Sequence, residues 1–283
     1  MIKNKTAWIL YYSNSGNTRN LAEMATTALV EKSWEVETTS LTDFDPEKMK
    51  KPGLVILGTP IHFWTIPHMA KQGIAKIPDL SDTIGFVFAT YGNVFSSGVT
   101  YELAMALETR GTTVLGGASL VCPHNFMSET GKRLGEIYPE FGKGQPDAKT
   151  REEYTNAIKY IAEKAEKGDI TSFDINRLKS PNPFITFIDQ FLPMELEIKT
   201  LAPVNYDDSM CQECGLCVKN CDTNSISNGF VKNKTINQKT CMRCYTCARN
   251  CPSGALTVNW TKNETILRLA KRIVKSPGSR III

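Results

Sequence analysis

The sequence predicts an α/β protein with a doubly wound parallel sheet of five strands, followed by a small cysteine-rich domain. Short apolar runs alternate with helical patterns through residue 170, which is typical of parallel strands joined by crossover helices. Further along, eight of the nine cysteines lie in two copies of one spacing. A chain of 283 residues has room for two such domains.

The strands and helices of the first domain follow from this alternation. Apolar runs bounded by polar residues or glycine predict five strands, at Thr6–Tyr12, Trp34–Thr39, Leu54–Leu57, Ile84–Thr90 and Thr113–Val121. Apolar residues at helical spacing predict helices at Asn17–Glu31, Tyr101–Arg110 and Ala148–Lys167. In such a sheet, ligands bind at the carboxyl ends of the strands. We therefore expect a ligand at the loops that follow the first, third and fourth strands.

The first of these loops has the composition of an anion site. It consists of Ser13, Asn14, Ser15, Gly16, Asn17 and Thr18 and leads into the first predicted helix. Small residues and a glycine let backbone amides and the helix N-terminus surround a phosphate. The absence of a lysine after the glycine, and of a G-x-G-x-x-G pattern, disfavours a nucleotide-hydrolysing loop. An ordinary capped turn is the alternative, because Ser and Asn are common helix caps.

Together with the preceding Tyr11-Tyr12, this loop resembles the phosphate loop of flavodoxins. The next two loops extend the resemblance, with Gly58-Thr59-Pro60-Ile61-His62-Phe63-Trp64 and Thr90-Tyr91-Gly92-Asn93. The resemblance covers residues 4–168 and implies a flavodoxin-like sheet that binds FMN. It also implies that Ser13, Ser15, Asn17 and Thr18 hold the phosphate. Trp64 and Tyr91 are the aromatics best placed to flank the isoalloxazine, and an exposed or core role is the alternative for each. Backbone amides of the later loops would bond the ring edge.

The second loop departs from the family pattern. His62, Phe63 and Trp64 follow one another where the family often has smaller residues, which leaves open how far a substrate could reach the ring. FMN is favoured over FAD because nothing in the sequence suggests an adenosine site. A flavodoxin-like domain without flavin is the alternative.

Two features after the fifth strand lie at the same edge. Cys122, the ninth cysteine, is expected to be buried and inert rather than reactive. Residues 122–147 form a long predicted loop, for which we expect a lid or docking role over the flavin edge. His62 and His124 could relay protons to a flavin, although a structural role is favoured for each.

The cysteine-rich region carries the metal-binding pattern. It contains Cys211-x2-Cys214-x2-Cys217-x3-Cys221 and Cys241-x2-Cys244-x2-Cys247-x3-Cys251-Pro252. Runs of this spacing are typical of [4Fe-4S] ligands, and the fourth cysteine of each run binds the other cluster. The predicted ligands are Cys211, Cys214, Cys217 and Cys251 for cluster one, and Cys221, Cys241, Cys244 and Cys247 for cluster two. Zinc is disfavoured because its sites usually have paired C-x2-C ligands, and disulfides because they need an exporting context.

Residues 204–262 resemble the bacterial two-cluster ferredoxins, which implies a small α+β domain. The two runs begin 30 residues apart, and Ser225-Ile226 after the first echoes Ala255-Leu256 after the second. Asp222 replaces the proline expected after Cys221, whereas Pro252 keeps it. The carboxylate would lower the potential of cluster two and the added N–H would raise it, so the sign of the effect is open.

The remaining segments are a connector and a tail. The connector, residues 171–203, is rich in large apolar side chains, and we expect it to pack between the two halves. The tail, residues 263–283, has a basic amphipathic pattern. Packing on its own domain is favoured for this tail over contact with a membrane surface or an acidic partner. Its last three isoleucines are expected to be disordered.

Charge and the absence of export signals suggest where the protein works. The formal net charge is +4, and residues 204–262 hold seven basic and four acidic side chains. This local excess compensates negative clusters rather than indicating nucleic-acid binding. With no apolar segment of signal-peptide or membrane-spanning length, we expect a cytoplasmic protein, from an anaerobe because oxygen damages such clusters.

The chain as a whole resembles the flavodoxin–ferredoxin fusion proteins of anaerobic bacteria and archaea. The resemblance implies an intracellular electron carrier that relays electrons between FMN, two [4Fe-4S] clusters and an external redox partner. One alternative is an FMN-dependent oxidoreductase that reduces a small acceptor with electrons from the clusters. A weaker alternative is a redox-responsive binding module. No catalytic acid or base is predicted.

Overall fold

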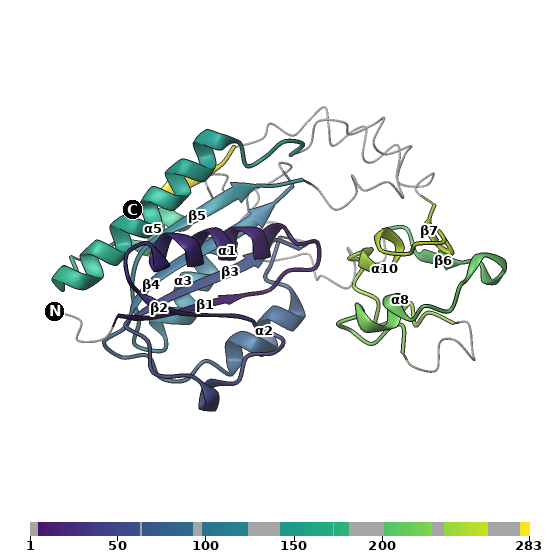
Figure 1. Cartoon of the computed structure of the whole chain (residues 1–283), viewed down its shortest axis with the longest axis horizontal. Coiled ribbons are helices and arrows are strands. Elements are labelled where there is room, and N and C mark those ends of the chain that lie inside the picture. The colour runs from purple at the N-terminus through teal and green to yellow at the C-terminus, as the bar shows by residue number, and fades with distance from the viewer. Residues whose placement is uncertain are drawn as a thin grey trace. The chain divides into compact units, whose positions relative to one another are not determined.

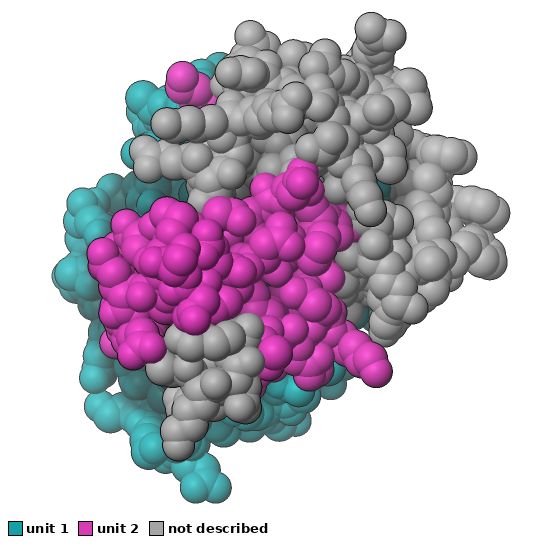
Figure 2. Space-filling view, turned by 90° about the vertical axis from the view of Figure 1, so that its right-hand side faces the viewer, with its two compact units in different colours: residues 1–122, 144–190, 276–283 teal, residues 123–143, 191–275 magenta. Residues whose placement is uncertain are grey.

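The structure is a computed structural model that describes residues 5–62, 64–92, 98–123, 142–171, 173–180, 201–227, 235–259 and 278–283. The chain divides into two compact units (Figure 2). Unit 1 consists of residues 1–122, 144–190 and 276–283, and unit 2 consists of residues 123–143 and 191–275.

Unit 1 is built around one mixed sheet. Its strands are β1 (Thr6–Tyr11), β2 (Glu35–Ser40), β3 (Leu54–Pro60), β4 (Ile84–Tyr91), β5 (Thr113–Val121) and β8 (Arg280–Ile282), in the order β2-β1-β3-β4-β5-β8. The first five strands are parallel, and their order 2-1-3-4-5 is that of flavodoxin-like folds. The predicted fold class is therefore confirmed.

The sheet has a sixth strand that corrects one expectation. β8 pairs antiparallel with β5, matching Gly117 with Ile282 and Ser119 with Arg280. The prediction that the last isoleucines are disordered is therefore wrong for Ile281 and Ile282. Without β8, β5 would be an edge strand with unpaired backbone groups, and β-branched residues are suited to covering it.

Helices cover both faces of this sheet (Figure 1). They are α1 (Asn17–Val30), α2 (His68–Ala75), α3 (Val99–Glu108) and α5 (Ala148–Lys167), with 3-10 turns η1 (Pro46–Lys48) and η4 (Ile175–Leu178). α1 and α5 share one apolar core with the sheet, and α2 and α3 share the other. The sequence did not predict α2, because this helix is only eight residues long and contains Gly73 and several polar residues.

Several described segments of unit 1 meet at one edge of the sheet. Cys122 directly follows β5, and Arg151 in the first turns of α5 is close enough to lower the pKa of the Cys122 thiol, against the larger effect of burial. Ser279 accepts a hydrogen bond from the backbone N–H of Val121, at 3.0 Å. The hydroxyl of Thr100, at the start of α3, donates to the carbonyl of Leu178 at 2.9 Å. All of these groups lie at the carboxyl edge of the parallel strands, where ligands bind in this fold.

Unit 2 is small and internally repeated. It contains β6 (Val204–Tyr206) paired antiparallel with β7 (Leu256–Val258), η5 (Asp208–Met210), and the short helices α8 (Leu216–Lys219) and α10 (Thr246–Arg249). The two helices are offset by 30 residues, as are three pairs of positions with positive φ: Glu213 and Arg243, Gly215 and Tyr245, Asn224 and Gly254. The 30-residue repeat predicted from the cysteine spacing is thus also a repeat of backbone conformation.

Several predicted segments lie partly or wholly outside the described residues. Of the connector, residues 171, 173–180 and 201–203 are described. Ile175 and Leu178 are buried in the core of unit 1, and Ala202 is buried in the core of unit 2. Most of the predicted lid and the amphipathic part of the tail fall outside. Within the described residues, no helix has both the length and the hydropathy needed to cross a membrane.

Candidate functional site

The predicted phosphate loop folds as a tight entry into α1. Gly16 is the N-cap residue and has φ +91°, a conformation that favours glycine. A side chain there would meet no atom within 4 Å, so the backbone angle and not space requires glycine. The N–H of Gly16 donates to the Ser13 hydroxyl oxygen at 3.1 Å, which closes the loop. The side-chain amide of Asn14 donates to the Tyr12 hydroxyl at 2.7 Å.

The end of α1 beneath this loop suits an anion. The helix is 14 residues long, no side chain caps its N-terminus, and its first turn contains no acidic residue. The first amides of a helix have no partner within the helix and lie at the positive end of its dipole. Ser13, Asn14 and Asn17 are partly exposed here and Ser15 is exposed, so the loop fits a phosphate group.

The other two loops meet this one at the same edge. Thr18 is buried, and its hydroxyl lies 2.8 Å from that of Thr90 at the end of β4. The N–H of Ile61 donates to the carbonyl of Thr90 at 2.8 Å. Thr59 is fully buried, and its hydroxyl has no hydrogen-bond partner among the described residues. Since a buried hydroxyl without a partner is costly, a bound ligand at this edge would satisfy it.

The second loop reverses direction in a tight turn. His62 and Thr65 exchange backbone hydrogen bonds of 3.1 and 3.0 Å. Trp64, between them, has φ +67°, which is rare for a bulky residue and is often found at functional sites. Its side chain is partly exposed, so Trp64 remains the aromatic that we predict beside a flavin ring. Phe63 lies outside the described residues.

Tyr91 has the core environment that was the alternative to a position beside the flavin ring. Its side chain is 5 % exposed, and its hydroxyl donates to the carbonyl of Gly278 at 2.5 Å. This bond ties the end of β4 to the carboxyl-terminal segment, and we no longer assign Tyr91 to the flavin ring. Gly92 is partly exposed, and Asn93 lies outside the described residues.

Cys122 is buried, as predicted. It belongs to the apolar core between the sheet, α1 and α5, and is 2 % exposed. Burial raises the pKa of its thiol to about 12, although the charge of Arg151 opposes this. The thiol is therefore neutral near pH 7, which suits an inert core residue. His124 lies outside the described residues.

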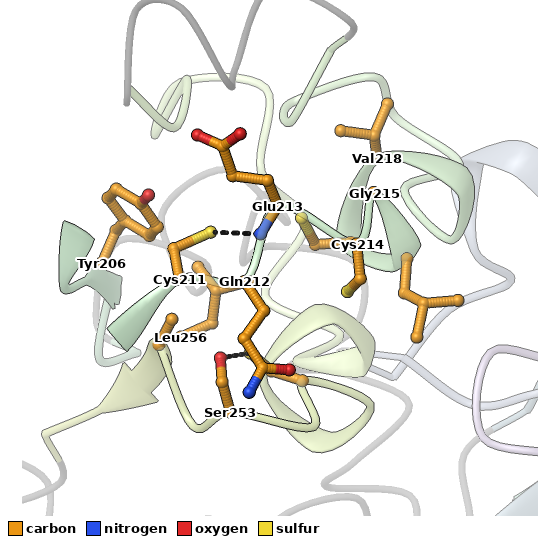
Figure 3. A pocket seen from close by; sticks show the side chains of 13 residues that line it. Tyr206, Cys211, Gln212, Glu213, Cys214, Gly215, Val218, Ser253 and Leu256 are labelled. Carbon is orange, nitrogen blue, oxygen red and sulfur yellow. Dashed lines mark hydrogen bonds between the residues drawn. The ribbon is translucent and has the colours of Figure 1, made fainter. Parts of the chain in front are cut away.

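Four of the predicted cluster ligands line one hollow in unit 2 (Figure 3). Cys211, Cys214 and Cys217 come from the first run, and Cys251 comes from the second. Cys221, the fourth cysteine of the first run, is not among the lining residues. The hollow measures about 430 Å³, counting the space open to solvent. The structure thus gathers the set of four that we predicted for cluster one.

The fourth cysteine of each run is held by equivalent hydrogen bonds. The backbone N–H of Ile226 donates to Cys221 Sγ at 3.4 Å, and that of Leu256 bonds Cys251 in the same way. The hydroxyls of Thr223 and Ser253 lie 3.7 and 3.6 Å from these sulfurs. Burial alone would raise the pKa of Cys251, but these bonds lower it. Donors of this kind favour the thiolate, which is the form that binds metal.

The predicted ligands of cluster two also lie near one another. Burial raises the pKa of the Cys247 thiol to about 12, and the neighbouring Cys244, Cys241 and Cys221 contribute to this rise. Burial likewise raises the pKa of Cys244. Cys221 is therefore near enough to Cys247 of the second run for their charges to interact. Bound iron would have to stabilise the thiolates of this more buried set.

These groupings differ from a site for a single ion. Among the described residues, no three His, Cys, Asp or Glu side chains are arranged to hold one metal ion. A single zinc ion needs all of its sulfur ligands within about 2.3 Å of one point. A four-iron cluster has no such requirement, because each cysteine binds a different iron atom.

Several residues that support these sites were not predicted from the sequence. Ser279 and Gly278 hold the ends of β5 and β4, but nothing in a short carboxyl-terminal segment identifies its partner strand. Thr223 and Ser253 could have been found, because each places a hydroxyl two residues after the fourth cysteine of its run.

Comparisons with known proteins found one matching family model and several similar solved structures. A family model described as "4Fe-4S binding domain" matches residues 234–257, which contain the second cysteine run. Among solved structures, a flavodoxin from the domain Archaea is 21% identical, with a TM-score of 0.43 over 57% of this chain and 99% of its own. Flavodoxin 2 from Bacillus cereus is 19% identical, with a TM-score of 0.45 over 56% and 99%. Rubredoxin oxygen:oxidoreductase from Desulfovibrio gigas is 18% identical, with a TM-score of 0.46 over 58% of this chain and 37% of its own.

No curated protein matches the chain. The strand order of unit 1 and the family match in unit 2 rest on separate parts of the sequence. The chain therefore joins a domain with a flavodoxin-like fold to a region that matches a 4Fe-4S binding domain.

Proposed function

We propose that this protein is an electron carrier that binds FMN in unit 1 and two [4Fe-4S] clusters in unit 2, and serves an external redox partner. The observation that carries the proposal is the hollow lined by Cys211, Cys214 and Cys217 together with Cys251. Three closely spaced thiols and a fourth from a distant run are the ligand arrangement of two-cluster ferredoxins. When bound, flavin supplies one- or two-electron chemistry and each cluster supplies one-electron chemistry.

Unit 1 supplies the groups that would hold FMN. The amides at the start of α1 and the side chains of Ser13, Ser15 and Asn17 would bind the phosphate. The exposed edge of Trp64 would pack on the flavin ring, and the buried Thr59 hydroxyl would gain a hydrogen-bond partner. Thr18 has a further part, because its bond to Thr90 holds the first loop against β4.

Unit 2 would supply the cysteine ligands of the clusters and the hydrogen-bond donors that stabilise their thiolates. Besides the donors to Cys221 and Cys251, the N–H of Glu213 donates to Cys211 Sγ at 3.4 Å (Figure 3). Hydrogen bonds to cluster sulfurs are one of the main controls of reduction potential. Thiolates of this kind persist only in a reducing compartment, and we place the protein there.

Cofactor content and reducing capacity test the proposal. Protein purified without oxygen should contain about eight irons and one FMN per chain. Stepwise reduction should consume about four electrons per chain, two for the flavin and one for each cluster. Failure to bind flavin, or an iron content of one or two atoms per chain, would contradict the proposal.

A further inference from the structure

The two cysteine runs of unit 2 differ sharply in exposure despite their common backbone. In residues 211–220, five side chains are exposed and none is buried, whereas in residues 241–250 four are buried and one is exposed. Cys214 is exposed, but its equivalent 30 residues later, Cys244, is not. The first run is therefore the accessible side of the repeat.

Individual substitutions within the repeat explain this difference. Gly215 and Tyr245 are equivalent, with φ of +72° and +57°. Tyr245 is 2 % exposed, packs in the core of unit 2 and donates its hydroxyl to the carbonyl of Ala202 at 2.9 Å. Gly215 has no side chain, and a Cβ added there would meet nothing within 4 Å. Beside it, Leu216 begins α8 and is 40 % exposed.

The two runs also differ in charge. Residues 207–219 contain three acids, Asp207, Asp208 and Glu213, and one base, a net charge of −2. The equivalent residues 237–249 contain Lys239, Arg243 and Arg249 and no acid, a net charge of +3. All three acids are exposed. The accessible side of the repeat is thus also its negative side.

We propose that the first-run face, made of Asp207, Asp208, Met210, Glu213, Cys214 and Leu216, is the docking surface for an external redox protein with a positively charged rim. The inference rests on the proposed function, because it identifies which cluster site faces the partner. Met210 is 48 % exposed and, with Leu216, provides apolar groups among the three acids. Apolar groups with a charged surround are typical of protein interfaces, and complementary charge speeds and orients encounters.

The proposal predicts where on unit 2 a cationic partner binds. The formal net charge of +4 counts neither the cofactors nor the thiolates that hold them. Two [4Fe-4S] clusters with their thiolates would each add a charge of about −2, and the FMN phosphate would add further negative charge, so the loaded molecule would be slightly negative. The position of the bound partner, and not binding alone, therefore identifies a local negative face. An acidic partner would instead be drawn to the second run, which is less exposed.

Binding between fully oxidised proteins tests the proposal without any electron transfer. The probe is ferric cytochrome c, a lysine-rich redox protein, and oxidised rubredoxin serves as the acidic counter-probe. The dissociation constant is measured by calorimetry on the full chain with its cofactors, and the footprint by hydrogen exchange. We expect cytochrome c to bind at low ionic strength and to be released by about 0.5 M salt. Protection should fall on residues 207–216 rather than on 237–246.

Charge-neutralising variants provide the matched control. Asp208→Asn with Glu213→Gln should weaken cytochrome c binding by roughly three- to tenfold at low salt. Asparagine keeps an acceptor for the Tyr206 hydroxyl, and the backbone N–H of residue 213 is unchanged. Lys239→Gln with Arg243→Gln alters the second run and should not weaken binding.

Iron and FMN content are measured for every variant first, so that loss of cofactors is distinguished from loss of docking. With full cofactor content, equal weakening by both variant pairs would overturn the proposal. Protection centred on residues 237–246, or tighter binding of rubredoxin than of cytochrome c, would also overturn it.

Discussion

Gly16 and Gly98 form a natural pair for testing the conformation of the phosphate loop. Both are N-cap residues of helices in unit 1, and neither would place a Cβ within 4 Å of another atom. They differ in φ, which is +91° at Gly16 and −74° at Gly98. Alanine at the two positions therefore isolates the cost of the backbone angle.

The expected difference follows from this single angle. A left-handed conformation costs an L-residue about 1–2 kcal/mol. Replacing glycine also stabilises by about 0.4–1 kcal/mol, because the unfolded chain loses freedom, and this gain applies to both variants. Gly98→Ala should thus be neutral or slightly stabilising. Gly16→Ala should be less stable than Gly98→Ala by about 1–2 kcal/mol in the free energy of unfolding.

Urea unfolding of the full chain without FMN measures this difference. Trp8, Trp34 and Trp64 all lie in unit 1, so tryptophan fluorescence follows mainly this unit. With a slope of about 2 kcal/mol per M, the two midpoints should differ by roughly 0.5–1 M. A midpoint for Gly16→Ala equal to or above that of Gly98→Ala would refute the conformation assigned to the loop.

Three further predictions concern unit 1. Ser279→Ala removes the acceptor for the Val121 N–H and should lower the free energy of unfolding by about 1 kcal/mol. Ser279→Thr keeps a hydroxyl and should not lower it. Equal urea midpoints for the two variants would count against β8 as a stabilising strand. Trp64→Gly removes the aromatic ring, so FMN should bind roughly tenfold more weakly in a fluorescence titration. The free energy of unfolding should not fall, because glycine accepts the positive φ of this position. Unchanged FMN affinity would show that Trp64 is not part of the site. Burial raises the pKa of Cys122 in the folded protein to about 12, so its thiol should resist iodoacetamide at pH 8 in the native protein and react once the protein is unfolded. The contribution of Cys122 to the free energy of unfolding should be full below the ordinary thiol pKa of about 8.5. It should decline as the pH rises toward 12. Rapid alkylation of Cys122 in the native protein would contradict its burial.

The sequence was most informative where residue type and spacing determine structure locally. Apolar runs and helical spacing predicted all five parallel strands and three of the four main helices of unit 1. The 30-residue repeat of the cysteines extends to backbone angles, such as those of Glu213 and Arg243. Gly16 needs its positive φ within its own loop, and so the loop could be predicted from its residues.

Long-range pairings were beyond the sequence. Nothing in Arg280–Ile282 indicates that it pairs with β5, because one arginine and two isoleucines suit many strand edges. Tyr91 ends a buried strand beside a predicted flavin loop, but its hydroxyl partner, Gly278, is 187 residues away in the sequence. The difference in exposure between the two cysteine runs depends on what packs around Tyr245, which spacing alone does not determine.

The exchange of the fourth cysteines is tested most directly by iron content in two double variants. Cys211→Ala with Cys251→Ala removes two predicted ligands of cluster one and leaves all four of cluster two. Cys211→Ala with Cys221→Ala removes one predicted ligand from each cluster. Cys122→Ala serves as the control for loss of a cysteine outside the sites.

The two pairs give opposite results under the two ligand assignments. We expect the Cys211 and Cys251 pair to keep about four irons in an intact four-iron cluster, visible by electron paramagnetic resonance after reduction. The Cys211 and Cys221 pair should keep no intact four-iron cluster. The reverse result, with the intact cluster in the Cys211 and Cys221 variant, would show that each run binds its own cluster and would contradict the account.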